Sequence, residues 1–338
     1  QIPLPQKNQP SLFLGHFSTY LTWSEAGWIL YSATEQLDET ESLLVSAMQN
    51  LYEMPSLSLT APCVARWSKK QYTSAFQHVQ EYIKAGDCYQ INLTQEFIAP
   101  ATGCLLDTAE QFWQLTDAPY AGYLRVDDFE LLSCSPELFI DFEIARKVVT
   151  KPIKGTMPRF SDPVLDEQSK SALQRSQKDQ AENVMIVDLL RNDLSVYAET
   201  GSVKTPKLFN IESFNQVHHM VSEVTATLKK EVNPFEMLLS ALPGGSITGA
   251  PKIRAMQIIN ELEEAPRGAY CGSMGYFNHD GTGSWNILIR SIQKYQNEVS
   301  LWAGGGITIA SDCDAEYQEC FDKVSAMLDL LNTWHKPI

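Results

Sequence analysis

The chain has 338 residues, of which 41 are acidic and 26 basic, and its formal net charge is −15. This charge counts against binding to nucleic acid or to an anionic membrane surface, because both depend on Lys and Arg contacts with phosphate groups. The 44% apolar content is that of a globular chain, no apolar run reaches the roughly 18 residues of a membrane span, and no signal peptide is visible.

The predicted elements alternate in groups along the chain. Periodicity and capping signals predict helices at 40–52, 68–84, 110–116, 162–192, 234–242, 250–262 and 314–331. Strands are predicted in the first 35 residues and at 90–98, 121–150, 203–228 and 269–303, with Gly304 to Gly306 expected to end the last group. Because strands and helices are grouped rather than strictly alternating, we expect an α+β fold with large antiparallel sheets.

The seven cysteines form no recognisable framework. Their number is odd and no CxxC pair occurs, which argues against both a set of disulfides and a zinc site. We therefore expect reduced, mostly buried thiols in a cytoplasmic protein. The chain opens on Gln1 rather than Met, from which we expect a truncated or processed N-terminus.

Two predicted helices carry carboxylates on faces that otherwise read as apolar. Glu182 extends the stripe formed by Met185, Ile186 and Leu189, where a carboxylate is costly unless it is paired or bound to a metal. The alternative is that Glu182 lies in the first turn and favours the positive helix end.

The last predicted helix repeats this pattern, since Glu316, Glu319 and Lys323 share one face of it. Glu319 and Lys323 are spaced as an exposed i, i+4 ion pair. Alternatively, carboxylates from two helices hold a hard cation such as Mg²⁺, which prefers oxygen ligands.

Two glycine-rich segments could bring backbone amides close to a small anion. The loop 243–249 precedes a predicted helix but lacks the spacing of a phosphate-binding Walker loop, and Gly304 to Gly306 form the second segment. Both could equally be tight turns. His218 and His219 are neighbours in a predicted strand and therefore point to opposite faces, so they do not form one metal site.

In their order, these motifs resemble the chorismate-utilising enzyme family over roughly residues 70–330. The resemblance rests on GDCYQINLTQEF (86–97), SCSPELFI (133–140), KPIKGT (151–156), AENVMIVDLLRNDL (181–194), VHHMVSEV (217–224), ALPGGSITGAPKIRAMQII (241–259), CGSMGYF (271–277), AGGGI (303–307) and DAEYQECFDKV (314–324). It implies one large α+β chorismate-binding unit with stacked antiparallel sheets surrounded by helices. Residues 66–332 would form this catalytic domain, and residues 1–65 a strand-rich remnant of a longer N-terminal region.

Two positions separate the subfamilies. Gln90 stands where water-adding members have a lysine base, and Lys154 stands where anthranilate synthases typically have alanine. The Ser-Ile-Thr at 246–248 also resembles the subfamily that aminates chorismate at C4, the component I of aminodeoxychorismate synthases. The alternative is component I of anthranilate synthase. A silent chorismate-binding paralogue is disfavoured, because the carboxylates that the family uses are retained.

The resemblance also implies roles for individual residues. Lys154 would attack C2 of chorismate and Glu137 would protonate the leaving hydroxyl, while Mg²⁺ would be held by Glu182 and Glu319 with Glu316 in support. The substrate-binding residues would be Gln90, His219, Ser246, Tyr270, Arg290, Gly304, Gly305, Gly306 and Lys323. The implied partners are chorismate, ammonia and a separate glutamine amidotransferase subunit, in the route to p-aminobenzoate and folate.

Overall fold

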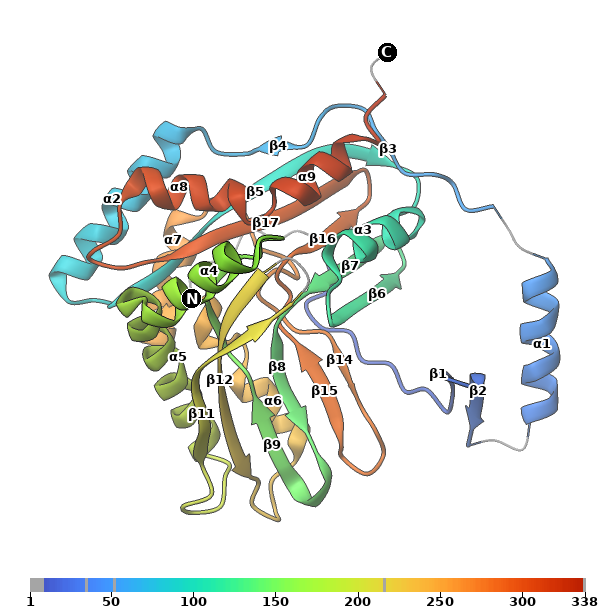
Figure 1. Ribbon diagram of the computed structural model, residues 1–338. Coiled ribbons are helices and arrows are strands. Elements are labelled where there is room, and N and C mark those ends of the chain that lie inside the picture. The colour runs from blue at the N-terminus through green and yellow to red at the C-terminus, as the bar shows by residue number, and fades with distance from the viewer. Residues whose placement is uncertain (1–8, 34–35, 51–52, 215–216, 337–338) are drawn as a thin grey trace.

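The computed structural model describes residues 9–33, 36–50, 53–214 and 217–336 (Figure 1). Its described strands form two large antiparallel sheets and a separate hairpin, which confirms the predicted α+β class. Within these residues, no helix is long and apolar enough to cross a membrane. All seven cysteines are free thiols, and all but Cys313 are buried, as predicted.

The first sheet has eight described strands. Their order is β13 (Gly249–Ala250), β5 (Gln90–Thr102), β17 (Glu298–Ile307), β16 (Ser291–Tyr295), β7 (Phe129–Ser135) and β6 (Tyr120–Val126), with β3 (Ser58–Leu59) and β4 (Val64–Ala65) also paired to β5. Strands β5 and β17 pair along an unbroken register from Glu298↔Pro100 to Ile307↔Ile91. This pairing joins the two longest strands of the sheet and forms its centre.

The second sheet has seven described strands. Their order is β10 (Ile153–Pro158), β12 (Val217–Thr227), β9 (Lys147–Thr150), β8 (Leu138–Phe142), β15 (Gly283–Asn286) and β14 (Gly275–Phe277), with β11 (Lys204–Ser213) also beside β12. Figure 1 shows this sheet in the lower half of the view, below β5 and β17.

Helices cover the sheets through apolar faces. Those that pack on the first sheet are α2 (Lys69–Ala85), α3 (Ala109–Thr116), α7 (Lys252–Leu262), α8 (Cys313–Asp322) and α9 (Ser325–Asn332). Those beside the second sheet are α4 (Pro163–Arg175), α5 (Gln177–Ser195) and α6 (Pro234–Ala241). Three short 3-10 turns complete the described fold: η1 (Leu105–Thr108), η2 (Ile144–Arg146) and η3 (Gly245–Ile247).

Helix α2 illustrates how local sequence sets an element. Ser68 and Gln71 form a reciprocal capping box at its start, and Gly86 ends it in the left-handed conformation at φ +83°. The buried face of the helix includes Tyr72, Phe76 and Val79, which pack in the same cluster as Ile91 of β5. The predicted boundaries of this helix are therefore confirmed within one residue.

The first two strands and the first helix lie to the right of the two large sheets in Figure 1. Strands β1 (Thr19–Ser24) and β2 (Gly27–Ser32) pair with each other, and helix α1 (Leu37–Gln49) has no buried residue among those described. The strands predicted in this region are present. The predicted end of α1 at 51–52 lies outside the described residues.

Three sequence expectations are wrong in detail. Gly304 to Gly306 do not end a strand but lie inside β17, where they pair with residues 92–94 of β5. The single last helix is two helices, because the backbone leaves the helical region at Val324, with φ −131°. The strands predicted at 269–303 are divided between the two sheets, with β14 and β15 in one and β16 and β17 in the other.

Candidate active site

The candidate site forms where one end of β17 meets α8, α5 and β10. Beyond Leu301, β17 has β5 on one side, whereas its pairing with β16 stops at that residue. Among the described strands, none covers the other edge of β17 at Gly304 to Gly306. Because successive amides of a strand point to alternate sides, this open edge can still offer backbone N–H groups to a ligand. The glycine amides that we expected to face an anion thus belong to a strand rather than a loop, and that role stays a prediction.

Gly305 allows the carboxylates of α8 to approach the strand. A Cβ atom at this position would lie 2.6 Å from Glu316 Oε2 and 3.2 Å from Glu319 Oε1. Any larger residue would displace both side chains. Glu316 is buried and accepts a hydrogen bond from Ser311 Oγ at 2.7 Å, whereas Glu319 is half-buried and forms an ion pair with Lys323 at 2.6 Å.

Lys323 connects this pair to the strand. It follows α8 directly, and its Nζ donates to the Gly304 carbonyl at 2.8 Å as well as pairing with Glu319. The ion pair that the i, i+4 spacing suggested is therefore present, and it lies at the site rather than on a remote solvated face.

Lys154 of β10 enters the same cluster from the second sheet. Its Nζ donates to the Ser246 carbonyl in η3 at 3.2 Å. Burial lowers the pKa of Lys154, and the ammonium of Lys323 lowers it further, while the carboxylates of Glu137, Glu182 and Glu319 act in the opposite direction. The net lowering increases the fraction of free amine at neutral pH.

Glu137 lies between β7 and β8 and is 6% exposed. Burial raises the pKa of Glu137 to about 7, although the nearby Lys154 and Lys323 and the Ile153 amide favour the charged form. Its own backbone N–H donates to Ser135 Oγ at 3.2 Å, which fixes the turn that carries it. A carboxyl group with this pKa can hold or release a proton near neutral pH.

Glu182 projects from α5 and is half-buried. Burial raises the pKa of Glu182 and of Glu316, and the carboxylate of Glu319 raises both further. Of the two interpretations of Glu182, its electrostatic coupling to Glu319 and Lys154 favours the one that places it in the site. Asp193, further along the same helix, is instead paired with Lys252 at 2.8 Å.

These carboxylates are suited to a hard divalent cation. Among the described residues, no three His, Cys, Asp or Glu side chains are close enough together to hold a metal ion by themselves. Mg²⁺, however, is commonly held by one or two carboxylates with the remaining ligands from substrate and water. The oxygen-only donor set and the space that Gly305 leaves for two carboxylates fit that requirement.

Gln90, at the start of β5, is completely buried, and neither amide atom has a hydrogen-bond partner among the described residues. It packs against Gly306, where a Cβ atom would lie 2.5 Å from Nε2. Leaving a buried amide without a hydrogen-bond partner is costly. The position of Gln90 beside Gly306 therefore fits a side chain that would bind a ligand.

His219 of β12 and Arg290, which lies in the segment between β15 and β16, form a second group. His219 is buried with Nδ1 2.8 Å from Thr156 Oγ1, and burial followed by the nearby Arg290 charge lowers its pKa to about 4. Burial also lowers the pKa of Arg290. The guanidinium makes no hydrogen bond or ion pair with the rest of the described protein, and Arg290 adopts φ +49°. His218 faces the other way, toward Asp166 and Ser213, as the strand alternation predicted.

Tyr270 is linked to β17 through a neighbouring aromatic ring. It stacks on Trp302 of β17, with ring centroids 6.0 Å apart, and the Arg267 guanidinium lies over its ring, 5.7 Å from the centroid. Arg267 and its partner Glu263 were not identified from the sequence. Their i, i+4 spacing was the available signal, but it is equally typical of an exposed pair.

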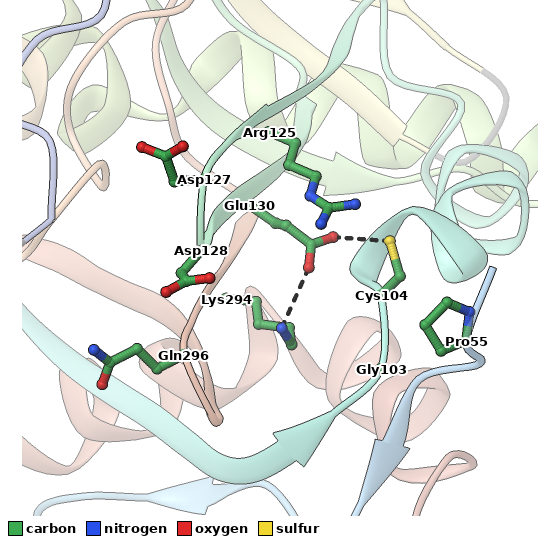
Figure 2. Close-up of a pocket in the computed structure, with 9 residues that line it drawn as sticks. All are labelled: Pro55, Gly103, Cys104, Arg125, Asp127, Asp128, Glu130, Lys294 and Gln296. Carbon is green, nitrogen blue, oxygen red and sulfur yellow. Dashed lines mark hydrogen bonds and ion pairs between the residues drawn. The ribbon is translucent and has the colours of Figure 1, made fainter.

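A separate cavity of about 180 Å³ opens between the ends of β6, β7 and β16 (Figure 2). None of the predicted site residues lines it. Glu130 at its floor accepts hydrogen bonds from Tyr123, Cys104 and the Leu105 amide and pairs with Lys294 at 3.3 Å. This network satisfies the buried charge within the protein, which is typical of a structural ion pair.

The comparisons with known proteins agree with this geometry. The family of chorismate binding enzymes matches residues 2–329, so the chain belongs to that family. It is 45% identical to aminodeoxychorismate synthase component 1 of Klebsiella aerogenes, over 82% of this chain and 61% of that protein. It is 37% identical to anthranilate synthase component 1 of Bacillus subtilis, over 83% and 54%. The chain thus spans about three fifths of the length of the first of these relatives.

Solved structures show the same fold. Anthranilate synthase component I from Streptococcus pneumoniae has a TM-score of 0.80 and 28% identity, and the match covers 92% of this chain and 72% of that one. The menaquinone-specific isochorismate synthase from Escherichia coli, at 21% identity, has a TM-score of 0.72 over 90% and 71% of the two chains.

His219 should make stability depend on pH. Its folded pKa of about 4 lies below the ordinary 6.5, so the unfolded chain takes up a proton first as the pH falls. This contribution to stability is complete above pH 6.5 and is lost towards pH 4. Relative to His219→Gln, the wild-type free energy of unfolding should fall by roughly 2 kcal/mol between pH 7 and pH 4.5, measured in urea. The exposed His78→Gln variant is the control and should behave like wild type.

Proposed function

We propose that this chain converts chorismate and ammonia to 4-amino-4-deoxychorismate, as component I of an aminodeoxychorismate synthase. The observation that carries the proposal is Lys154, whose pKa is lowered in a cluster that also contains the protonatable Glu137. The 45% identity to a protein of that name supports the same activity. Ammonia would come from a glutamine amidotransferase subunit, and the product would lead to p-aminobenzoate and folate.

The chemistry follows from the two titrating groups. The free amine of Lys154 adds to C2 of chorismate as the C4–oxygen bond breaks, and Glu137 gives its proton to the leaving hydroxyl, which departs as water. Ammonia then adds at C4 and the bond between C2 and Lys154 breaks, which returns the amine. A pKa of about 7 for Glu137 and a lowered pKa for Lys154 allow the acid to be protonated while the amine is free.

The remaining residues would hold the two carboxylates of the substrate. Arg290, whose guanidinium has no partner in the described protein, would bind the enolpyruvyl carboxylate together with Tyr270 and the amides of Gly304 to Gly306. Lys323 and Ser246 would lie near the ring carboxylate, and Gln90 and His219 would contact the substrate beside them.

Glu182 and Glu319 would hold Mg²⁺, with Glu316 in support. Bound there, the ion would supply positive charge that binds the ring carboxylate and polarises the ring. The chain's own contribution would be to supply carboxylates from two helices, with Gly305 leaving room for those of α8.

Anthranilate synthase component I is the alternative, because a relative of that name is 37% identical. The two activities differ in their products, since aminodeoxychorismate keeps the enolpyruvyl group and anthranilate has lost it. The test is incubation of the chain with chorismate, Mg²⁺ and ammonium, with the products separated by mass. A product that retains the enolpyruvyl mass supports the proposal, and anthranilate as the main product overturns it.

Lys154→Ala should abolish most aminodeoxychorismate formation, by about 10³-fold or more, because it removes the nucleophile. Without ammonium, wild type should form a mass adduct on the peptide that contains Lys154. Lys151→Ala is the matched control, since it removes the other lysine of the same motif and should keep most of the activity. A near wild-type rate in Lys154→Ala would exclude Lys154 as the nucleophile.

Glu319→Gln should abolish turnover and weaken Mg²⁺ binding in the presence of chorismate, because it removes one charged ligand. Calorimetry with Mg²⁺ and the product assay are the two measurements. Glu223→Gln is a suitable control, because Glu223 pairs with Lys207 on the second sheet. Mg²⁺ affinity unchanged in Glu319→Gln would remove Glu319 from the metal site.

A further inference from the structure

The Ile247 carbonyl connects η3 to other parts of the chain by hydrogen bonds. It accepts hydrogen bonds from Asn92 Nδ2 at 2.9 Å and Arg267 Nη1 at 3.2 Å, and the Cys271 thiol approaches it at 3.6 Å. These donors come from β5 and from the segment after α7, so two distant parts of the chain hold one oxygen of η3. Ile247 is adjacent to Ser246, whose carbonyl accepts the Lys154 amine.

Arg267 is itself fixed by a buried carboxylate. Its Nε and Nη2 both donate to Glu263, each at 2.7 Å, and Nη2 also donates to the Asn92 carbonyl at 2.7 Å. The side chains of Arg267 and Glu263 are only 13% and 3% exposed. A planar guanidinium that forms all these hydrogen bonds is held in one orientation, whereas a lysine ammonium on its flexible side chain would not be.

Further contacts hold the pair from both sides. Glu263 Oε1 accepts from the amide and the hydroxyl of Thr94, at 3.1 and 2.7 Å, and the Arg267 carbonyl accepts from Gln293 Nε2 at 2.9 Å. Removing a buried ion pair from water is costly, and the saturated hydrogen bonding offsets that cost. The arrangement therefore links the first sheet rigidly to η3.

We propose that Arg267 is a positioning residue that holds η3 so that the Ser246 carbonyl orients the amine of Lys154 toward the substrate. The expected effect on kcat rests on the proposed function, whereas the expected effect on the position of Lys154 does not. Arg267 also lies over Tyr270, which stacks on Trp302 of β17. The same guanidinium thus fixes η3 relative to the strand that carries Gly304 to Gly306.

The test uses two variants of the full chain. Arg267→Lys keeps the charge opposite Glu263, but one ammonium cannot reproduce a fork that bonds Glu263, Asn92 and Ile247 together. The double variant Arg267→Gln/Glu263→Gln leaves no unpaired buried charge and remains informative if the first does not fold. For both, kcat should fall about tenfold or more while KM for chorismate changes by less than about threefold, since orientation and not binding is lost.

A second readout does not depend on activity. The rate at which an amine-reactive acylating reagent modifies Lys154 at a fixed pH, relative to the exposed Lys207, should rise at least about threefold in both variants, because the amine is no longer held to Ser246. Arg146→Gln is the control. Arg146, in η2 beside the second sheet, also donates to backbone carbonyls, those of Leu228, Lys229 and Val232.

The outcomes separate the two proposals. Unchanged kcat and unchanged Lys154 acylation in a folded variant would overturn the role of Arg267. The same would follow if kcat fell and Lys154 acylation were unchanged, or if Arg146→Gln gave equal losses. If wild type makes no aminodeoxychorismate, the proposed function fails, and the acylation ratio alone then decides whether Arg267 positions Lys154.

Discussion

The pairing of β5 with β17 is the constraint on which the candidate site depends. Over this register, Gln90 at one end of β5 comes to lie against Gly306, and the edge of β17 beyond Leu301 is left open on the side away from β5. Helix α8 then packs on β17 closely enough to place Glu316 and Glu319 over Gly305. A shift of one residue in this register would exchange the faces of the whole strand and separate these groups.

Charge compensation within the cluster is the second constraint. Burial and the nearby carboxylate of Glu319 raise the pKa of Glu182 on α5 and of Glu316 on α8, while Lys154 favours the charged form of the first and Lys323 that of the second. Neither the carboxylates nor the lysines would be stable half-buried without the other, because an unpaired buried charge costs several kcal/mol. The pKa values of Glu137, Glu182, Glu316 and Lys154 thereby move toward neutral pH, where proton transfer with a ligand is most efficient.

The sequence predicted those features that depend on nearby residues. The capping box of Ser68 and Gln71 and the terminal Gly86 define α2 locally, and His218 and His219 point to opposite faces because any strand alternates. The α+β class followed from the grouping of elements in the same way. These signals need no knowledge of the rest of the fold.

Features set by distant contacts were missed or wrong. Three consecutive glycines predicted a strand end, because glycine has a low propensity for strands. In the structure, β5 approaches so closely that a Cβ at Gly304 would collide with the Leu93 carbonyl. The sheet therefore requires glycine at this position. The break between α8 and α9 interrupts an apolar pattern that continues across it. Arg267 and Glu263 were not identified, because their spacing does not reveal burial by β5 and η3. The roles of the site residues themselves stay predictions.

The ion pair between Lys323 and Glu319 bears on how such a site could take up a cation. Lys323 now neutralises the carboxylate that a divalent ion would need, at 2.6 Å, and also donates to the Gly304 carbonyl. A divalent ion and an ammonium compete for the same oxygen, so metal binding would release Lys323 from Glu319. An ammonium released in this way would lie near the open edge of β17, where an anionic substrate would compensate its charge. Metal and substrate would therefore favour each other's binding, because each compensates a charge that the other leaves unpaired.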